Sequence, residues 1–414
     1  MKILHTSDWH LGSTLCGKKR YDEFDRFFDW MIDCITAEQI DVILISGDIF
    51  DTSNPSSKAI EYYFNFLGRV AKTHCQYVVV TAGNHDSPSF LDAPRELLKF
   101  LNIFSIGEVS DRYDDEVIVL KDQQKNPFLI VGAVPFLRDK DVRSATAGES
   151  SDEKSRNLLN GIQEHYRSVY AIAERRRAET GKEIPVVVMG HLFAAGGHSA
   201  EGDGVRELYI GNLARVNTGI FPSGIDYLAL GHLHTPQKIN NCETIRYSGA
   251  PLPMGFAEAQ SQKSIVLVEF GPEGRILTRE ISIPQFRNLV SIRGNHETIT
   301  SELRDLKRKG IPAWVEIILD DDRIIPEIQE MTNSIVRGSD IEVLKITNLR
   351  VTSQILSQMR IDESLDDLDE TEVFIRCLDA HNVPQEQRPE FMELFDEILL
   401  GIRQKDQMGE ENIS

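Results

Sequence analysis

Residues 42–51 read Val-Ile-Leu-Ile-Ser-Gly-Asp-Ile-Phe-Asp, an apolar run rich in β-branched residues that ends in a polar turn. A short continuous apolar run of this kind is typical of a strand that is covered on both faces. The same unit recurs along the chain, at residues 2–5 followed by 7–10, 78–80 followed by 83–86, 186–189 followed by 190–191, and 227–230 followed by 231–234. The repetition predicts several buried strands, each ending in a cluster of Asp, Asn, His or Gly.

Helical patterns separate these strands. After the first run, apolar residues recur at the spacing of one helix face: Phe24, Phe28, Met31 and Ile35. Alternating strands and helices predict a layered α/β domain, which we place at residues 1–283. In such sheets ligands bind beyond the carboxyl ends of the strands, and all five polar clusters stand at that end. This shared position makes the five clusters one candidate site.

Two further regions follow. Residues 284–350 show strand patterns at 289–293, 314–319 and 341–346 and helix patterns at 298–308 and 326–336, which predicts a small α+β domain. Residues 351–414 carry two amphipathic helix patterns, around 373–378 and 391–402. These helices either pack on their own domain or form a clamp for a partner helix, and the residues alone favour neither interpretation.

The charge of the chain is unevenly distributed. Its 414 residues hold 45 Lys and Arg against 65 Asp and Glu, a formal net charge of −20, with a hydrophobic content of 41% that excludes a fully disordered chain. Such acidity argues against binding nucleic acid through a broadly basic surface. However, the 54 residues from Ile361 onward hold 16 acidic and 4 basic side chains, so this tail carries −12 of the −20. The part with the candidate site is far less acidic.

The cysteines and the apolar segments indicate a compartment. The five cysteines form no Cys-x-x-Cys pair, which predicts free thiols in a reducing environment: Cys16, Cys34, Cys75, Cys242 and Cys377. The first residues become polar too soon for the core of a signal peptide, and no apolar run approaches the roughly 20 residues that span a bilayer. We therefore expect a cytoplasmic protein.

The polar clusters contain the ligand types of two divalent metal ions held side by side. Asp8 and His10 stand two residues apart at a strand end, where a local kink would direct both at one ion. His232 and His234 share this spacing and are expected to point to one side of their strand end. Asp48 has two carboxylate oxygens and is predicted to bridge both ions.

Asn84 adds a neutral oxygen ligand and His191 adds an imidazole. A set this rich in imidazole suits a transition metal such as Mn²⁺ better than Mg²⁺. Two such ions activate water and stabilise the oxygens of an in-line phosphoryl displacement, and their charge attracts a phosphate monoester or diester. The chain has neither a phosphate-binding Gly-x-x-x-x-Gly-Lys-Ser/Thr loop nor a Gly-x-Ser-x-Gly elbow, which disfavours ATP hydrolysis and a covalent serine mechanism.

Three side chains next to the predicted ligands have more than one interpretation. His85 is placed to stabilise developing charge or to donate a proton to the leaving oxygen. Asp51 is expected to hold His85 in the required tautomer, an interpretation that we prefer to simple turn capping. For Asp86, turn capping and a catalytic role are equally good interpretations.

In their order along the chain, the motifs resemble those of the calcineurin-like metallophosphoesterases: Asp8-x-His10, Gly47-Asp48-x-x-Asp51, Gly83-Asn84-His85-Asp86, Gly190-His191 and Gly231-His232-x-His234. More closely, residues 5–12 (His-Thr-Ser-Asp-Trp-His-Leu-Gly), 47–52 and 82–87 are similar to the SbcD family of bacterial nuclease subunits. Residues 134–138 and 246–253 match further segments of that family. The resemblance covers nearly the whole chain and departs at no ligand position.

The resemblance implies a fold and an activity. The fold is an α/β layered metallophosphoesterase sandwich with a small α+β capping domain and C-terminal amphipathic helices. The activity is that of a Mn²⁺-dependent nuclease, an exonuclease on duplex DNA ends and an endonuclease on single strands and hairpins. The residues implied as metal ligands are Asp8, His10, Asp48, Asn84, His191, His232 and His234, with His85 as the catalytic histidine.

The resemblance also implies partners. The C-terminal helices in 351–414 would grip the coiled coil of an SbcC-type SMC-like ATPase, which gates access to duplex DNA, and this favours the clamp interpretation. A homodimer within a heterotetramer is expected. Because the bound metals and the partner would supply most of the attraction for DNA, an acidic chain remains compatible with a nuclease that binds DNA poorly alone. Lys18, Lys19 and Arg20 are candidate DNA contacts, with a solvated loop as an equal alternative.

Two other functions compete with this one. A phosphoprotein phosphatase or small-molecule phosphodiesterase would use the same metal chemistry, but the capping domain and the apolar tail helix weigh against it. A catalytically inactive scaffold is disfavoured by the intact ligand set.

Overall fold

The computed structural model describes residues 1–110, 112–143, 149–194, 218–321 and 325–349, together with ten residues between 371 and 395. The chain divides into two compact units, Met1–Leu289 and Val290–Ser414. The predicted domain boundaries at 283/284 and 350/351 stay predictions. No helix in the described part of the chain has the length and apolar character needed to cross a membrane.

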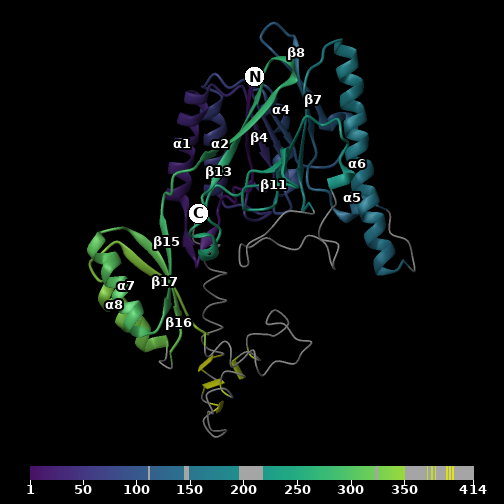
Figure 1. Cartoon of the computed structure of the whole chain (residues 1–414). Helices are drawn as coiled ribbons and strands as arrows, with labels where there is room; N and C mark the ends of the chain where they lie inside the picture. Colours follow the sequence, from purple (N-terminus) through teal and green to yellow (C-terminus); the bar gives the residue numbers. More distant parts are fainter. Residues whose placement is uncertain are drawn as a thin grey trace. The chain divides into compact units, whose positions relative to one another are not determined.

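Two six-stranded sheets build the first unit (Figure 1). The first sheet has the order β14-β13-β1-β4-β5-β6, and its strands β1, β4, β5 and β6 are parallel. Its strands are β1 (Lys2–Thr6), β4 (Val42–Ser46), β5 (Tyr77–Thr81), β6 (Ile103–Ile106), β13 (Ser264–Phe270) and β14 (Ile276–Ser282). The parallel central strands of this sheet end at one common edge.

The second sheet has the order β11-β12-β10-β9-β8-β7, and its strands β12, β10, β9 and β8 are parallel. Its strands are β7 (Val117–Lys121), β8 (Pro127–Ala133), β9 (Val186–His191), β10 (Tyr227–Gly231), β11 (Gln237–Ile239) and β12 (Cys242–Tyr247). A separate two-stranded hairpin follows β1 and consists of β2 (Thr14–Leu15) and β3 (Lys18–Lys19).

Alternate residues of the central strands enter different cores. In β4, Val42 and Leu44 join a cluster built from residues of both sheets, whereas Ile43 and Ile45 join a cluster with the helices that cover the first sheet. Strands β9 and β10 repeat this alternation in the second sheet. Because successive side chains of a strand point to opposite faces, a continuous apolar run is what a strand buried on both faces requires. The predicted layered α/β architecture is confirmed.

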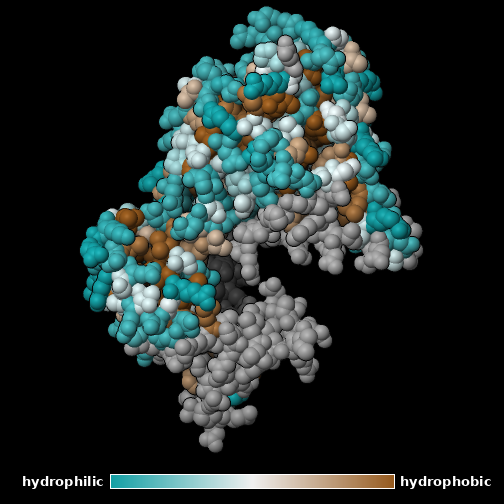
Figure 2. Space-filling view, in the orientation of Figure 1, coloured by the Kyte–Doolittle hydropathy of each residue, from teal (hydrophilic) through white to brown (hydrophobic). Residues whose placement is uncertain are grey.

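Helices cover the outer face of each sheet. Helices α1 (Tyr21–Glu38) and α2 (Ser57–Val70) lie on one side of the unit and the long helix α6 (Ser151–Thr180) on the other (Figure 1). Trp9 is buried under the first pair, where its ring centroid lies 5.2 Å from that of Phe66. The shorter helices are α3 (Pro88–Asp92), α4 (Arg95–Lys99) and α5 (Asp139–Val142). With the apolar faces turned inward, hydrophilic residues form most of the surface of this unit in Figure 2.

The second unit contains a three-stranded sheet in the order β15-β16-β17 and two helices. Its elements are β15 (Asn288–Gly294), α7 (His296–Lys309), β16 (Ala313–Leu319), α8 (Ile325–Val336) and β17 (Ile341–Asn348). Side chains of the strands and helices share one apolar core, in which Ile299 and Leu303 of α7 contribute the helical face. The predicted small α+β arrangement is confirmed in both the order and the type of its elements.

Most of the tail lies outside the described residues, including the greater part of the predicted helices at 373–378 and 391–402. Phe374 and Phe395, one from each predicted helix, are described and stack with a centroid distance of 4.1 Å. Leu378 is buried, whereas Ile375, Phe391 and Leu394 are exposed.

Candidate metal centre

The polar turns after the strands adopt backbone conformations that are rare for residues with side chains. Asp8, His10 and Asp48 have positive φ angles of 53°, 47° and 49°. The first two turns are also bonded together, because Asp8 N donates to the Gly47 carbonyl at 3.0 Å and His10 N donates to the Asp48 carbonyl at 3.0 Å. Such conformations cost about 1–3 kcal/mol each and concentrate at functional sites. The kink predicted after β1 is present and lies against the turn after β4.

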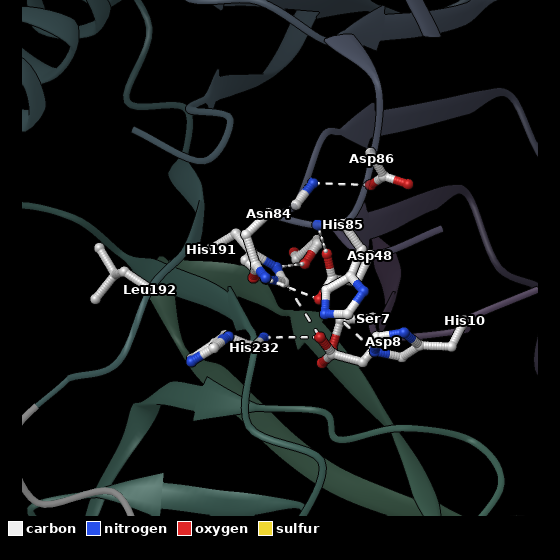
Figure 3. A network of polar contacts seen from close by, with 12 residues as sticks. Ser7, Asp8, His10, Asp48, Asn84, His85, Asp86, His191, Leu192 and His232 are labelled. Carbon is white, nitrogen blue, oxygen red and sulfur yellow. Dashed lines mark hydrogen bonds and ion pairs between the residues drawn. The ribbon is translucent and has the colours of Figure 1, made fainter. Parts of the chain in front are cut away.

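The bends gather the predicted ligands into two groups. Asp8, His10 and His234 form one, and Asp48, His191 and His232 form the other; in each group the potential ligand atoms lie within 4.8 Å of one another. Figure 3 labels Asp8, His10, Asp48, His191 and His232, which come together from strand ends of both sheets. All six side chains are buried.

Further contacts place Asn84 beside the second group and Asp48 between the two groups. Asn84 Oδ1 lies 3.0 Å from His191 Nε2, which places the predicted neutral ligand beside the second group. Asp48 Oδ2 lies 3.2 Å from His191 Nε2 and 3.6 Å from His10 Nε2, so this carboxylate stands between the groups. The structure therefore brings all seven predicted ligands together, with Asp48 in the position that a bridging ligand needs.

The expectation that His232 and His234 point to one side was wrong. The structure assigns His234 to the group of Asp8 and His10, and His232 to the group of Asp48 and His191. His232 has a φ angle of 105°, which lies outside the strand region, so the two-residue alternation of a strand does not continue through it.

Close approach of the loops explains two of the glycines. A Cβ atom at Gly83 would collide with the Asp48 carboxylate, and one at Gly231 would collide with the Ser46 carbonyl. Only glycine lets the loops after β5 and β10 come this near to the turn after β4.

Burial and neighbouring charges shift the titration of the ligands. Burial raises the pKa of Asp8 to about 6, although His191 opposes the shift. Burial would also raise the pKa of Asp48, but His191 and His10 outweigh it and hold that pKa well below its usual range. Burial lowers the pKa of His191, but the Asp48 and Asp8 carboxylates overcome this and raise it to about 9. The carboxylates and imidazoles of this site therefore shift one another's pKa values.

The protonation state and contacts of His232 show whether the residues of the two groups fit metal ions. Burial and the charge of His191 lower the pKa of His232 to about 3, so its ring is neutral at physiological pH. Its Nε2 is buried and has no hydrogen-bond partner among the described residues. A neutral imidazole with an unshared nitrogen, beside carboxylate and amide oxygens, is a ready ligand for a divalent transition metal. The donor set fits two such ions.

His85 lies next to the first group without belonging to the seven ligands. Its ring packs edge-on against His10 with a centroid distance of 4.8 Å, and its backbone N donates to Asp48 Oδ1 at 2.9 Å. His85 Nδ1 lies 2.7 Å from the Asp51 carbonyl oxygen. A carbonyl can only accept, so Nδ1 carries the hydrogen and Nε2 is the atom that can gain or lose a proton.

Asp51 thus lies where the sequence analysis placed it, against His85, and the group that fixes the tautomer of His85 is the Asp51 backbone carbonyl. The Asp51 carboxylate instead faces His10, with Oδ1 3.3 Å from His10 Nδ1. The sequence does not show which oxygen of Asp51 faces His85 and which faces His10, because this depends on the backbone conformation of the turn after β4. The pattern of a carboxylate beside the second nitrogen of a ligand histidine is common at metal sites, where it orients the ring.

Asp86 acts as a support for the loops. Its carboxylate accepts hydrogen bonds from Gly83 N at 2.8 Å, Ile49 N at 3.1 Å and Phe50 N at 2.9 Å. These bonds connect the loops after β4 and β5, which carry Asp48 and Asn84. Of the two interpretations of Asp86, the structure favours turn capping.

Replacing Asp86 with Asn is expected to destabilise the metal-free chain by about 2 kcal/mol or more, because hydrogen bonds to a charged acceptor contribute about 1.5–3 kcal/mol each and the Asn amide would face a backbone N–H. Urea unfolding measures the change. Asp33→Asn, on the exposed face of α1, is the control and should stay within about 0.5 kcal/mol. Equal stability of the two variants would contradict the supporting role.

Of the basic residues proposed near the first motif, Arg20 does not face solvent and cannot contact DNA. It is buried, donates to Glu23 through Nε at 2.9 Å and Nη2 at 2.8 Å, and reaches the Pro253 carbonyl through Nη1 at 2.6 Å. Lys18 and Lys19 are exposed on β3. Arg20 therefore joins α1 to the 251–253 loop, and only the two lysines remain candidate DNA contacts.

Comparison with known proteins agrees with this fold. The family described as calcineurin-like phosphoesterase matches residues 1–236, and that described as type 5 capsule protein repressor C-terminal domain matches residues 285–382. Since the first match covers more than half of the sequence, the chain belongs to the calcineurin-like phosphoesterase family.

Within this class the chain is similar to proteins named as the SbcD subunit of the nuclease SbcCD. It is 32% identical to that of Escherichia coli K12 over 398 residues, which cover 95% of this chain and 97% of the relative. It is 33% identical to that of Rhodobacter capsulatus over 291 residues, covering 69% and 70% of the two chains. For Bacillus subtilis the identity is 31% over 292 residues, covering 70% and 71%. The predicted relationship to the SbcD family is confirmed.

Proposed function

We propose that this chain is the nuclease subunit of an SbcCD-like complex and hydrolyses DNA phosphodiesters at a centre of two divalent metal ions, with Mn²⁺ as the working metal. The observation that carries the proposal is the pair of adjoining, buried ligand groups that meet at Asp48. The relatives named as nuclease subunits support DNA as the substrate.

When bound, the two ions would supply an activated water and stabilise the charge that develops on the phosphate oxygens. The part of the chain is to hold and orient them. Asp8, His10 and His234 would bind one ion and Asn84, His191 and His232 the other, with Asp48 between them. The large share of imidazole nitrogens in this set favours Mn²⁺ over Mg²⁺.

His85 would act on the DNA itself. With Nδ1 fixed on the Asp51 carbonyl, Nε2 is the atom that can hold a proton and donate it to the leaving oxygen or to the charged phosphate. Asp51 would contribute through this carbonyl and through its carboxylate on His10. Both are positioning contacts, because they act through the two histidines.

A substrate panel tests the nuclease against its main alternative, a phosphoprotein phosphatase or small-molecule phosphodiesterase. The purified chain is incubated with Mn²⁺ and end-labelled duplex DNA, hairpin DNA or a phosphopeptide, with and without the ATPase partner. We expect exonuclease cleavage at duplex ends and endonuclease cleavage of hairpins and single strands, with the partner and ATP increasing duplex cleavage. Phosphopeptide hydrolysis without DNA cleavage under any condition would reject the proposal.

The first unit has an exposed apolar surface that we assign to a second copy of this chain. Around α4, Leu97 is 70% exposed, Phe100 88% and Leu101 48%, although their spacing suits a buried helix face. Contiguous exposed apolar side chains of this size mark interaction sites.

We expect light scattering to show a dimer for the wild type and a monomer for Phe100→Glu. Leu277→Glu, at a separate exposed apolar position on β14, should remain a dimer, and a dimeric Phe100→Glu would refute the assignment.

The tail would bind the coiled coil of the SbcC-type ATPase. Support comes from the exposed Ile375, Phe391 and Leu394 beside the stacked Phe374 and Phe395, an arrangement that offers apolar side chains to a partner helix. We expect removal of residues 385–414, or the double variant Phe391→Glu and Leu394→Glu, to abolish binding in a pull-down with the coiled coil. Leu277→Glu is the matched control, and binding retained by the double variant would contradict the clamp.

A further inference from the structure

Behind the first ligand group lies a chain of buried hydroxyls. Ser7 Oγ donates to Asp8 Oδ2 at 2.5 Å and lies 2.7 Å from Ser248 Oγ. Ser7, Asp8 and Ser248 are all fully buried. Because the Ser7 hydroxyl gives its hydrogen to Asp8, the bond between the serines is donated by Ser248. The second Asp8 oxygen, Oδ1, accepts a hydrogen bond from His232 N at 2.8 Å. Both carboxylate oxygens of Asp8 are therefore held by hydrogen bonds from the protein.

His234, a second member of the same group, is held through its main chain. Its carbonyl oxygen accepts from Ala250 N at 3.0 Å and from Lys263 Nζ at 2.9 Å. Lys263 also donates to Glu258 Oε2 at 2.8 Å, and both charged side chains are buried. Burying an ion pair carries a large desolvation penalty, which makes it a poor way to gain stability alone. Here the pair places the Lys263 ammonium group on the backbone carbonyl of His234, a residue of the first ligand group.

Both supports come from residues 248–263, and both end on the group of Asp8, His10 and His234. The second group is supported elsewhere. His191 Nδ1 lies 3.0 Å from the Ser46 carbonyl, and the loops that carry Asp48 and Asn84 are joined by Asp86. Apart from the bond from His232 N to Asp8, the supporting contacts named for the two groups come from different residues.

We propose that Ser248 and Lys263 are positioning residues for the first metal site, formed by Asp8, His10 and His234, and that the second site forms without them. The inference deepens the proposed function and rests on its two-metal centre. Residues that orient ligands typically change metal affinity by about 10–100-fold when they are replaced. If the proposal holds, replacing Ser248 or Lys263 changes the metal affinity by this factor at the first site only.

The test titrates the metal-free full chain with Mn²⁺ by calorimetry and follows the two binding steps by electron paramagnetic resonance. For Ser248→Ala we expect one step to weaken roughly 10–100-fold and the other to change less than about twofold. The double variant Lys263→Met and Glu258→Gln removes both buried charges and should weaken the same step. Ser264→Ala is the matched control, because Ser264 is also buried and its hydroxyl has no hydrogen-bond partner among the described residues.

The outcomes separate the two proposals. A wild-type chain that binds fewer than two Mn²⁺ ions would reject the metal centre itself. If the wild type binds two ions and Ser248→Ala behaves like Ser264→Ala, or weakens both steps equally, the positioning role is overturned. Thermal unfolding of the metal-free variants checks their fold, and Ser248→Ala, which removes a single oxygen, decides the question if the double variant does not fold.

Discussion

Asp48→Asn is expected to lower Mn²⁺-dependent DNA cleavage by about 10³-fold or more, the largest effect of any single substitution in the site. Asp48 stands between the ligand groups, 3.2 Å from His191 Nε2 and 3.6 Å from His10 Nε2. Loss of its charge would weaken the binding of both metal ions, which stabilise the transition state by several kcal/mol. Each 1.36 kcal/mol of lost stabilisation lowers the rate about tenfold. Cleavage of labelled hairpin DNA under single-turnover conditions measures the effect.

The substitution keeps the local geometry, since an Asn side-chain oxygen can still accept from His85 N as Asp48 Oδ1 does. Asp226→Asn is the matched control. Its carboxylate accepts from Val186 N at 2.7 Å at the opposite end of β10 from His232, so it undergoes the same chemical change away from the site. A loss of activity in Asp48→Asn no greater than in Asp226→Asn would contradict the bridging role.

His85→Ala is the second prediction of large effect, with a different signature. Removing a group that transfers a proton typically lowers the rate about 10²–10⁴-fold. Because His85 is not one of the seven ligands, and its backbone bond to Asp48 survives the change, we expect the variant to bind Mn²⁺ as the wild type does. Activity and metal content are measured on the same samples.

Exposed His74 provides the control for His85, because His74 precedes β5 and so lies at the opposite end of this strand from His85. It should leave both activity and Mn²⁺ binding unchanged. A His85→Ala variant that loses its metal would make His85 a ligand, and one that retains full activity would remove it from the mechanism.

The fold could be predicted because the information is local. In each apolar run, such as residues 42–45, the even-numbered side chains enter one core and the odd-numbered side chains enter another. A strand that lies between two layers requires apolar residues at both sets of positions. The grouping of the seven candidate ligands could be predicted for a related reason: they stand at or just after the carboxyl ends of parallel strands in the two sheets.

What could not be predicted depends on side-chain direction at bends and on contacts between distant segments. The spacing of His232 and His234 indicated that both point to one side of their strand end, but His232 has a φ angle of 105° and the two histidines belong to different ligand groups. Arg20 stands beside two exposed lysines in the sequence, and its burial on Glu23 and the Pro253 carbonyl is visible only in the folded chain. Ser248 carries no signal of its own, because a buried serine gains its role from the residue it meets.

The most direct test of the two-metal centre is anomalous scattering from crystals of the full chain grown with Mn²⁺. The structure predicts two anomalous peaks, one among Asp8, His10 and His234 and one among Asn84, His191 and His232, with Asp48 in contact with both ions. A single peak at saturating Mn²⁺, or peaks away from these side chains, would contradict it.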